Sequence, residues 1–193
     1  MALAIAVYCG SRFGDDARFA DAARSLGTLI GERGGTLVYG GGRVGLMGTA
    51  ADAAIAAGAS VVGVIPEALM QREVGHQGLT ELHVVRTMHE RKQLMAARAD
   101  AFVALPGGIG TLEELYEVWS WQQLGYHDKP VALLNVAGYY DALLAFQAQA
   151  HRRGFVSDAQ HEALIVDDDV ARLLRRIELA ALRASAPDDY SQI

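Results

Sequence analysis

The sequence predicts an α/β fold: a doubly wound, Rossmann-like, mostly parallel sheet with helices on both faces. Short runs of apolar and β-branched residues alternate along the chain with longer segments of helical periodicity. This alternation favours parallel strands joined by crossover helices. With 193 residues, 51% of them hydrophobic, the chain is long enough to bury one substantial core. We therefore expect a single domain over residues 1–183 and, because its apolar content is low, a disordered tail at 184–193.

Six short apolar segments, bounded by glycine, proline or polar residues, are expected to form the strands of one sheet. They are Ala2–Cys9, Thr36–Tyr39, Ser60–Ile65, Glu81–Val85, Ala101–Leu105 and Pro130–Leu134. The first segment contains the single cysteine, Cys9. We expect it to be a packed thiol rather than a nucleophile, because free cysteine is among the most buried residue types.

Six longer segments have apolar residues three and four positions apart, the spacing that turns one helix face towards a core. These expected helices are Asp15–Arg33, Gly45–Ala57, Met88–Ala99, Thr111–Leu124, Tyr139–Arg152 and Val170–Leu182. The rhythm breaks over Pro66–Thr80, which is polar and contains glycine. We expect this segment to line a site.

The composition argues against polyanions and membranes as partners. The formal net charge is −6, and Lys92 and Lys129 are the only lysines, so the chain lacks the basic stripe that nucleic acids require. No apolar stretch reaches the roughly 20 residues that span a bilayer, and the start of the sequence does not resemble a signal peptide. We therefore expect a cytoplasmic protein that binds neither nucleic acid nor membrane.

Glycine-rich loops follow three of the expected strands: Gly10–Arg12, Gly40–Gly48 and Pro106–Thr111. Ligands of open parallel sheets bind beyond the carboxyl ends of the strands, so all three loops would share one edge. Glycine allows close approach of the backbone to a ligand, and the N-terminus of the next helix suits a phosphate. A tight turn is the alternative explanation for one such loop, but two on the same edge favour a phosphate site.

Residues 40–45 also fit the dinucleotide-binding pattern G-x-G-x-x-G, and Glu67 follows the third strand about where a ribose-binding acid would lie. A nicotinamide-dependent enzyme is therefore one alternative. The pattern is weak here because the loop follows the second strand rather than the first, and because Pro66 beside Glu67 favours a turn.

Charged residues occupy two further positions at the same edge. Arg91 and Lys92 lie near the start of the helix after the fourth strand, and Glu114 lies one turn into the helix after the fifth. Taken alone, the two basic residues fit a solvated helix face, and the pair Thr111 and Glu114 fits a capping box. A catalytic role is the other interpretation.

The sequence resembles the LONELY GUY family of cytokinin riboside 5′-monophosphate phosphoribohydrolases, which have also been labelled possible lysine decarboxylases. The family hallmark P-G-G-x-G-T-x-x-E corresponds to residues 106–114, and its M-x-x-R-K to Met88–Lys92. Further agreement lies in YGGGRVGLMG at 39–48, VVGVIP at 61–66 and Glu73 of QREV, so the resemblance covers about residues 3–165. It implies hydrolysis of the N-glycosidic bond of an N6-modified adenosine 5′-monophosphate, which releases the base and ribose 5-phosphate. It also implies a homodimer.

The resemblance implies that Arg91 and Glu114 are catalytic. The residues expected to contact the nucleotide are Ser11, Gly41, Gly42, Glu73, Met88, Lys92, Gly108, Ile109, Gly110, Thr111, Leu112, Glu113 and Ser120. Two positions depart from the family. Arg12 stands in place of the second serine of the common Gly-Ser-Ser, which here reads Gly10-Ser11-Arg12, and Ser120 stands where threonine is common. The stretch Val118–Leu124 is expected to serve the base pocket, a subunit interface or core packing.

The predicted chemistry needs a carboxylate, a cation and no cofactor. Loss of the base builds positive charge on the ribose, which Glu114 can stabilise, or Glu114 can activate water. Arg91 can support the departing base or anchor the 5′-phosphate, and we expect it to orient the phosphate side of the ribose and steady Glu114. The six histidines show no metal-ligand spacing, so we expect no metal.

A pyridoxal-dependent decarboxylase is disfavoured because it needs a Schiff-base lysine. Lys129 precedes a strand and so lies at the wrong edge of the sheet, and Lys92 is assigned to the nucleotide. A carrier that binds a nucleotide or cofactor without turnover remains an alternative, because a fold never proves an activity.

Overall fold

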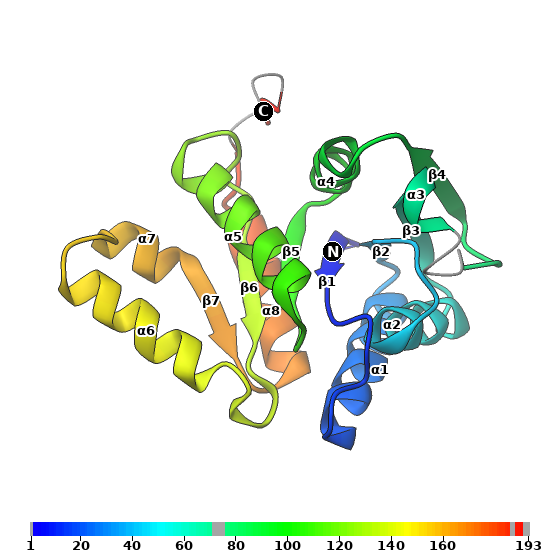
Figure 1. The fold of residues 1–193 in the computed structure, drawn as a ribbon, viewed down its shortest axis with the longest axis horizontal. Coiled ribbons are helices and arrows are strands. Elements are labelled where there is room, and N and C mark those ends of the chain that lie inside the picture. The colour runs from blue at the N-terminus through cyan, green and yellow to red at the C-terminus, as the bar shows by residue number, and fades with distance from the viewer. Residues whose placement is uncertain (1, 71–75, 186–187, 191–193) are drawn as a thin grey trace.

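The computed structural model describes residues 2–70, 76–185 and 188–190, which form one seven-stranded sheet with helices on both faces (Figure 1). The strand order is β4-β3-β2-β1-β5-β6-β7, and every described strand pair is parallel. The strands are β1 Ala4–Tyr8, β2 Thr36–Tyr39, β3 Ser60–Pro66, β4 Glu81–Val85, β5 Ala101–Ala104, β6 Val131–Leu134 and β7 Leu164–Asp167. The predicted doubly wound α/β class is confirmed.

The prediction of six strands was wrong, because Leu164–Asp167 forms a seventh strand at the sheet edge beside β6. This strand begins directly where the short helix α7, Asp158–Ala163, ends. No glycine or proline separates the two elements, so the sequence carries no signal for their boundary.

The predicted helices are present, with ends that differ by at most two residues. They are α1 Ala17–Glu32, α2 Gly45–Ala56, α4 Met88–Ala97, α5 Ile109–Gln123, α6 Asp141–Arg152 and α8 Val170–Ala181. Besides α7, the sequence did not predict two short elements: α3, Glu67–Met70, inside the segment Pro66–Thr80, and the 3₁₀ turn η1, Val136–Gly138. In the described part of the chain, no helix is both long and apolar enough to cross a membrane.

Two hydrophobic clusters cover the two faces of the sheet. One joins β1, β2 and β5 to helices α1, α2 and α8, and it contains Cys9, which confirms the predicted packed thiol. The other lies under α4, α5 and α6 and contains Trp119 and Trp121, both buried. The tryptophans therefore serve core packing, one of the three roles that the sequence left open.

Part of the C-terminal tail packs on the domain instead of extending from it. Tyr190 is buried against Trp121 and His127, and its carbonyl accepts a hydrogen bond from Gln93 Nε2 at 2.7 Å. Lys129 Nζ lies 2.5 Å from Asp188 Oδ2 at the start of β6. Lys129 therefore lies at the amino edge of the sheet, as the sequence predicted.

The position of α2, which carries the second glycine loop, depends on close packing against α1. A Cβ added at Gly27 would lie 2.2 Å from the carbonyl oxygen of Ala50 and 3.0 Å from the amide nitrogen of Ala54. Both atoms belong to the backbone of α2 and cannot rotate away. The two helices can approach this closely because Gly27 has no side chain.

Substituting Gly27→Ala tests this constraint, because two effects have opposite signs. Helix propensity alone would stabilise the protein by about 1 kcal/mol. The clash with α2 should instead destabilise it by about 1–3 kcal/mol. Urea unfolding of the wild type and the variant would measure the difference, and a higher unfolding free energy for Gly27→Ala would contradict the packing argument.

Candidate active site

Three loops meet at the carboxyl edge because β1 lies between β2 and β5 in the sheet. Gly10, two residues after the end of β1, connects the first of these loops to the other two. Its amide donates to the carbonyl of Pro106 at 3.0 Å, and its carbonyl accepts from the amide of Leu46 at 3.0 Å. The loops after β1, β2 and β5 are therefore held together by backbone hydrogen bonds, as the strand-end rule predicted.

The helices α2 and α5, which follow two of these loops, begin without a side-chain cap. Their N-caps are Val44 and Gly108, and neither helix has an acidic residue in its first turn. By contrast, α1, α4, α7 and α8 are each capped by an aspartate, serine or threonine side chain. Free first-turn amides and the positive end of the helix dipole favour an anion at these two positions.

The capping box expected for Thr111 and Glu114 is absent from α5. The helix begins at Ile109, two residues earlier than predicted, so Thr111 is its third residue and is buried. Glu114 therefore lies beyond the first turn of α5, outside the position that a capping box requires.

Arg91 on α4 carries a buried guanidinium that contacts the glycine loop. The residue is 6% exposed, and its Nη2 donates to the carbonyl of Gly40 at 3.3 Å. Its Nε has no hydrogen-bond partner among the described residues. A buried cation with an unused donor is costly, so the site is suited to an anionic or strongly polar ligand. The alternative of a solvated helix face for Arg91 is wrong.

A cavity of about 310 Å³ brings the two expected catalytic residues together. Among the sequence-predicted site residues, those that line it are Ser11, Met88, Arg91, Gly108, Ile109, Gly110, Thr111, Glu113 and Glu114. Cys9, Met47 and Leu69 also line this cavity and were not predicted. Leu69 comes from α3, so the segment Pro66–Thr80 does reach the site.

Glu114 is half-buried, and its negative charge changes the pKa values of two residues at the end of β1, Tyr8 and Cys9. Burial raises the pKa of the Cys9 thiol well above its usual value, and the negative charge of Glu114 raises it further. The same two causes raise the pKa of Tyr8. Both groups therefore stay protonated and neutral, and Cys9 is unsuited to act as a nucleophile.

Five predicted contact residues lie outside the lining of this cavity: Gly41, Gly42, Lys92, Leu112 and Ser120. Gly41 and Gly42 are buried in the loop that holds Arg91, and Leu112 packs against the core under α5. Ser120 lies on a different surface of α5, beside a small groove with Trp119 and Phe155. Glu73 lies outside the described residues.

Lys92 pairs with α5 instead of facing the cavity. Its Nζ contacts Glu113 and lies 2.8 Å from Glu117 Oε1. Burial lowers the pKa of Lys92, but the hydrogen bonds to these two carboxylates outweigh it, so the pKa lies above its usual value. A protonated Lys92 therefore ties α4 to α5 and fixes the spacing between the helices that carry Arg91 and Glu114.

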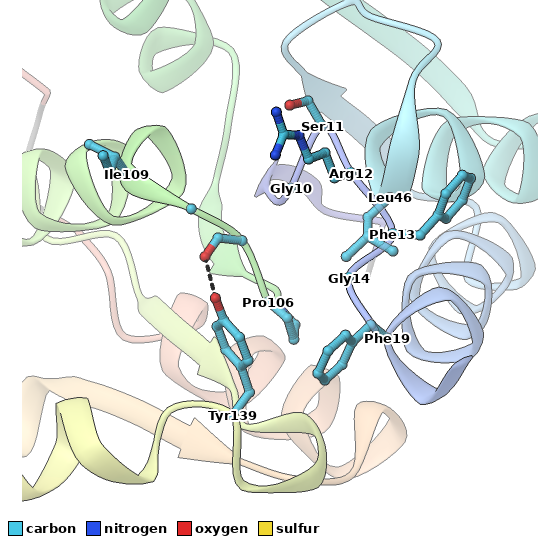
Figure 2. Close-up of a pocket in the computed structure, with 12 residues that line it drawn as sticks. Gly10, Ser11, Arg12, Phe13, Gly14, Phe19, Leu46, Pro106, Ile109 and Tyr139 are labelled. Atoms are coloured by element: carbon cyan, nitrogen blue, oxygen red, sulfur yellow. Dashed lines mark hydrogen bonds between the residues drawn. The ribbon is translucent and has the colours of Figure 1, made fainter. Parts of the chain in front are cut away.

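A second, larger cavity of about 530 Å³ adjoins the first (Figure 2). The two share Gly10, Ser11, Gly108 and Ile109. Tyr139 forms part of the second cavity, and its hydroxyl donates to the carbonyl of Gly107 at 2.6 Å. Tyr139 was not among the site residues that the sequence predicted, although it follows β6 and residues after strands often form ligand sites.

No three histidine, cysteine, aspartate or glutamate side chains gather into a metal-binding group within the described ranges. The buried His127 uses both ring nitrogens in the fold: Nε2 with the carbonyl of Val118 and Nδ1 with the amide of Lys129. The groups that line the first cavity can thus act through a carboxylate, a guanidinium and backbone amides.

Comparison with known proteins places this site in a family. The model of a family described as "Possible lysine decarboxylase" matches residues 47–177. The cytokinin riboside 5′-monophosphate phosphoribohydrolase LOG of Oryza sativa subsp. japonica is 50% identical over 174 residues, which are 90% of this chain and 72% of that protein. LOG1 of Arabidopsis thaliana, with the same activity in its name, is 48% identical over 90% of this chain and 82% of its own.

Two solved structures share the fold at low sequence identity. The molybdenum cofactor carrier protein from Chlamydomonas reinhardtii has a TM-score of 0.71 at 22% identity, over 94% of this chain and 99% of that one. DNA processing protein A from Helicobacter pylori has a TM-score of 0.60 at 12% identity, over 92% and 80%. These two likenesses support the fold alone. The sequence identity to the plant enzymes shows that the chain belongs to the LONELY GUY family of cytokinin riboside 5′-monophosphate phosphoribohydrolases.

Proposed function

We propose that this protein hydrolyses the N-glycosidic bond of an N6-substituted adenosine 5′-monophosphate and releases the free base and ribose 5-phosphate. The observation that carries the proposal is that two charged groups, one basic and one acidic, line the same cavity. Arg91 is buried there with an unused donor, and Glu114 lines the same cavity beside the uncapped start of α5. The names of the plant relatives specify the same reaction.

Glu114 acts at the anomeric carbon. As the bond from C1′ to the base breaks, the electron pair leaves with the base and the ribose ring becomes positively charged. A carboxylate held near that ring stabilises the charge, and it can accept the proton of the water that attacks C1′. Cys9, the other potential nucleophile in the cavity, is kept protonated by burial and by Glu114 itself.

The 5′-phosphate binds at the first turn of α5. The amides of Ile109, Gly110 and Thr111 have no acceptor within the helix, and the N-cap residue Gly108 has no side chain to cap them. Arg91 reaches the same cavity from α4 and adds a fixed positive charge that orients the phosphate side of the ribose. Holding the phosphate in this way places the ribose over Glu114 and lowers the entropic part of the barrier.

A carrier that binds a nucleotide without turnover is the second candidate. It would use the same loops and the same helix start, so fold and phosphate binding do not separate the two functions. A carrier has no need of a carboxylate at the anomeric carbon. The presence of Glu114 in the cavity with Arg91 favours the hydrolase.

We further propose that the protein is a cytoplasmic homodimer built from one domain over residues 1–183. Three large apolar side chains that a subunit interface would cover support a dimer: Leu124 after α5, Phe146 on α6 and Phe155 after α6 are 61–86% exposed. The single buried cysteine is compatible with a reducing compartment.

The variant Glu114→Gln separates hydrolase from carrier. It keeps the shape of the side chain but removes the negative charge that stabilises the ribose cation. We expect kcat for base release to fall by about 10²–10⁴-fold, while the Kd for AMP changes little. Chromatographic detection of the base and calorimetric titration with AMP would measure the two quantities.

Glu90→Gln is the matched control, since Glu90 adjoins Arg91 in sequence but hydrogen-bonds to Arg86 at the protein surface. It should retain the wild-type rate. Retained turnover in Glu114→Gln would remove Glu114 from the mechanism.

The variant Gly40→Ala tests whether Arg91 must lie where the glycine loop holds it. A Cβ at position 40 would lie 1.9 Å from Arg91 Nη2, the mobile end of a long side chain. The guanidinium should therefore move away with little loss of stability, and kcat/KM should fall at least about tenfold. Enzyme assays together with a melting curve would show both effects, and wild-type kcat/KM in this variant would contradict the assigned position of Arg91.

A further inference from the structure

The larger cavity is continuous with the candidate active site but differs from it in charge. The smaller cavity is lined by Arg91, Glu113 and Glu114, whereas Arg12 is the one charged side chain among the residues that line the larger cavity. Arg12 is exposed and forms no ion pair with any other described residue. An anion would therefore find a free cation in the larger cavity and no competing carboxylate.

The shape of the larger cavity is also unlike that of a simple phosphate site. Its volume of about 530 Å³ far exceeds that of one phosphate group. Phe19 and Tyr139 form an edge-to-face pair at one end, with ring centroids 5.4 Å apart, and Figure 2 shows Arg12 at the other end. The cavity thus combines a cation with aromatic surface, which suits an anion that carries a sugar or a planar ring.

The direction of a bound nucleotide links the two cavities. If C1′ lies at Glu114 and the 5′-phosphate lies at the first turn of α5, any group beyond that phosphate points away from Glu114. The residues Gly108 and Ile109 at this turn line both cavities. A group attached to the 5′-phosphate would therefore enter the larger cavity.

We propose that the larger cavity is a subsite for nucleotides extended beyond the 5′-phosphate, in which Arg12 binds the second phosphate and the Phe19–Tyr139 pair contacts the sugar or ring that follows. The ligand class is a nucleoside 5′-diphosphate linked to a sugar or to a second nucleoside. This inference rests on the proposed position of the nucleotide in the active site.

The aromatic end of the subsite is a stable part of the fold. Tyr139 is fixed by its hydrogen bond to the carbonyl of Gly107 and by ring contacts with Phe19 and Tyr140. Tyr140 in turn donates to the carbonyl of Leu105 at 2.6 Å. The aromatic end is therefore held against the loop that begins α5, which supports a preformed binding surface.

Calorimetric titration with AMP and with ADP-ribose tests the proposal, with every measurement made in the Glu114→Gln background so that AMP is bound but not cleaved. We expect ADP-ribose to bind more tightly than AMP. The variant Arg12→Ser places at this position the residue common in the family. It should lower the ratio of ADP-ribose affinity to AMP affinity at least about tenfold, the range of a hydrogen bond between charged groups.

Arg43→Ser is the matched control, because Arg43 is an exposed cation of the second glycine loop that lines neither cavity. It should leave the affinity ratio unchanged. Three results would each overturn the proposal: ADP-ribose binding no tighter than AMP, equal losses for both ligands in Arg12→Ser, or the same effect from Arg43→Ser.

Release of adenine from AMP, measured on the protein with Glu114 intact, distinguishes this proposal from the proposed function. If AMP is not hydrolysed but the Arg12-dependent preference for ADP-ribose is present, the hydrolase assignment fails and the subsite stands. If AMP is hydrolysed and the preference is missing, only the subsite fails.

Discussion

The two backbone hydrogen bonds of Gly10 hold the candidate site together. They join the loop after β1 to Leu46 at the start of α2 and to Pro106 in the loop before α5. Parallel pairing of β1 with β2 and β5 brings these loops to one edge, and the Gly10 bonds then fix their relative positions. The uncapped starts of α2 and α5 therefore face the same space, and the site can bind an anion through backbone groups where no lysine side chain lines it.

Neighbouring charged residues on α4, and likewise on α5, point in different directions and serve different purposes. On α4, Arg91 is buried against Gly40, while the next residue, Lys92, pairs with Glu113 and Glu117. On α5, those two acids lie one turn apart and face α4, and Glu114 turns towards the cavity. The ion pairs thus set the distance between two helices, and the unpaired Nε of Arg91 is left for the ligand.

Sequence predicted the fold class, the site edge and most of the cavity lining, because glycine after an apolar run marks the end of a strand. It did not predict β7, which no turn residue separates from α7. It also assigned Ser120 to the nucleotide, which stays a prediction, although Ser120 does not line the cavity that holds Glu114. Six residues along a helix rotate a side chain by about 240°, so Ser120 lies on a different surface from Glu114. Tyr139 was missed because its role depends on a hydrogen bond to Gly107, 32 positions away.

Product analysis with AMP and isopentenyladenosine 5′-monophosphate would test the central claim most directly. Chromatography of each incubation should show free base and ribose 5-phosphate in equal amounts, with faster release from the prenylated nucleotide. A raised melting temperature with AMP, but no base from either nucleotide, would contradict the account and make the protein a nucleotide carrier.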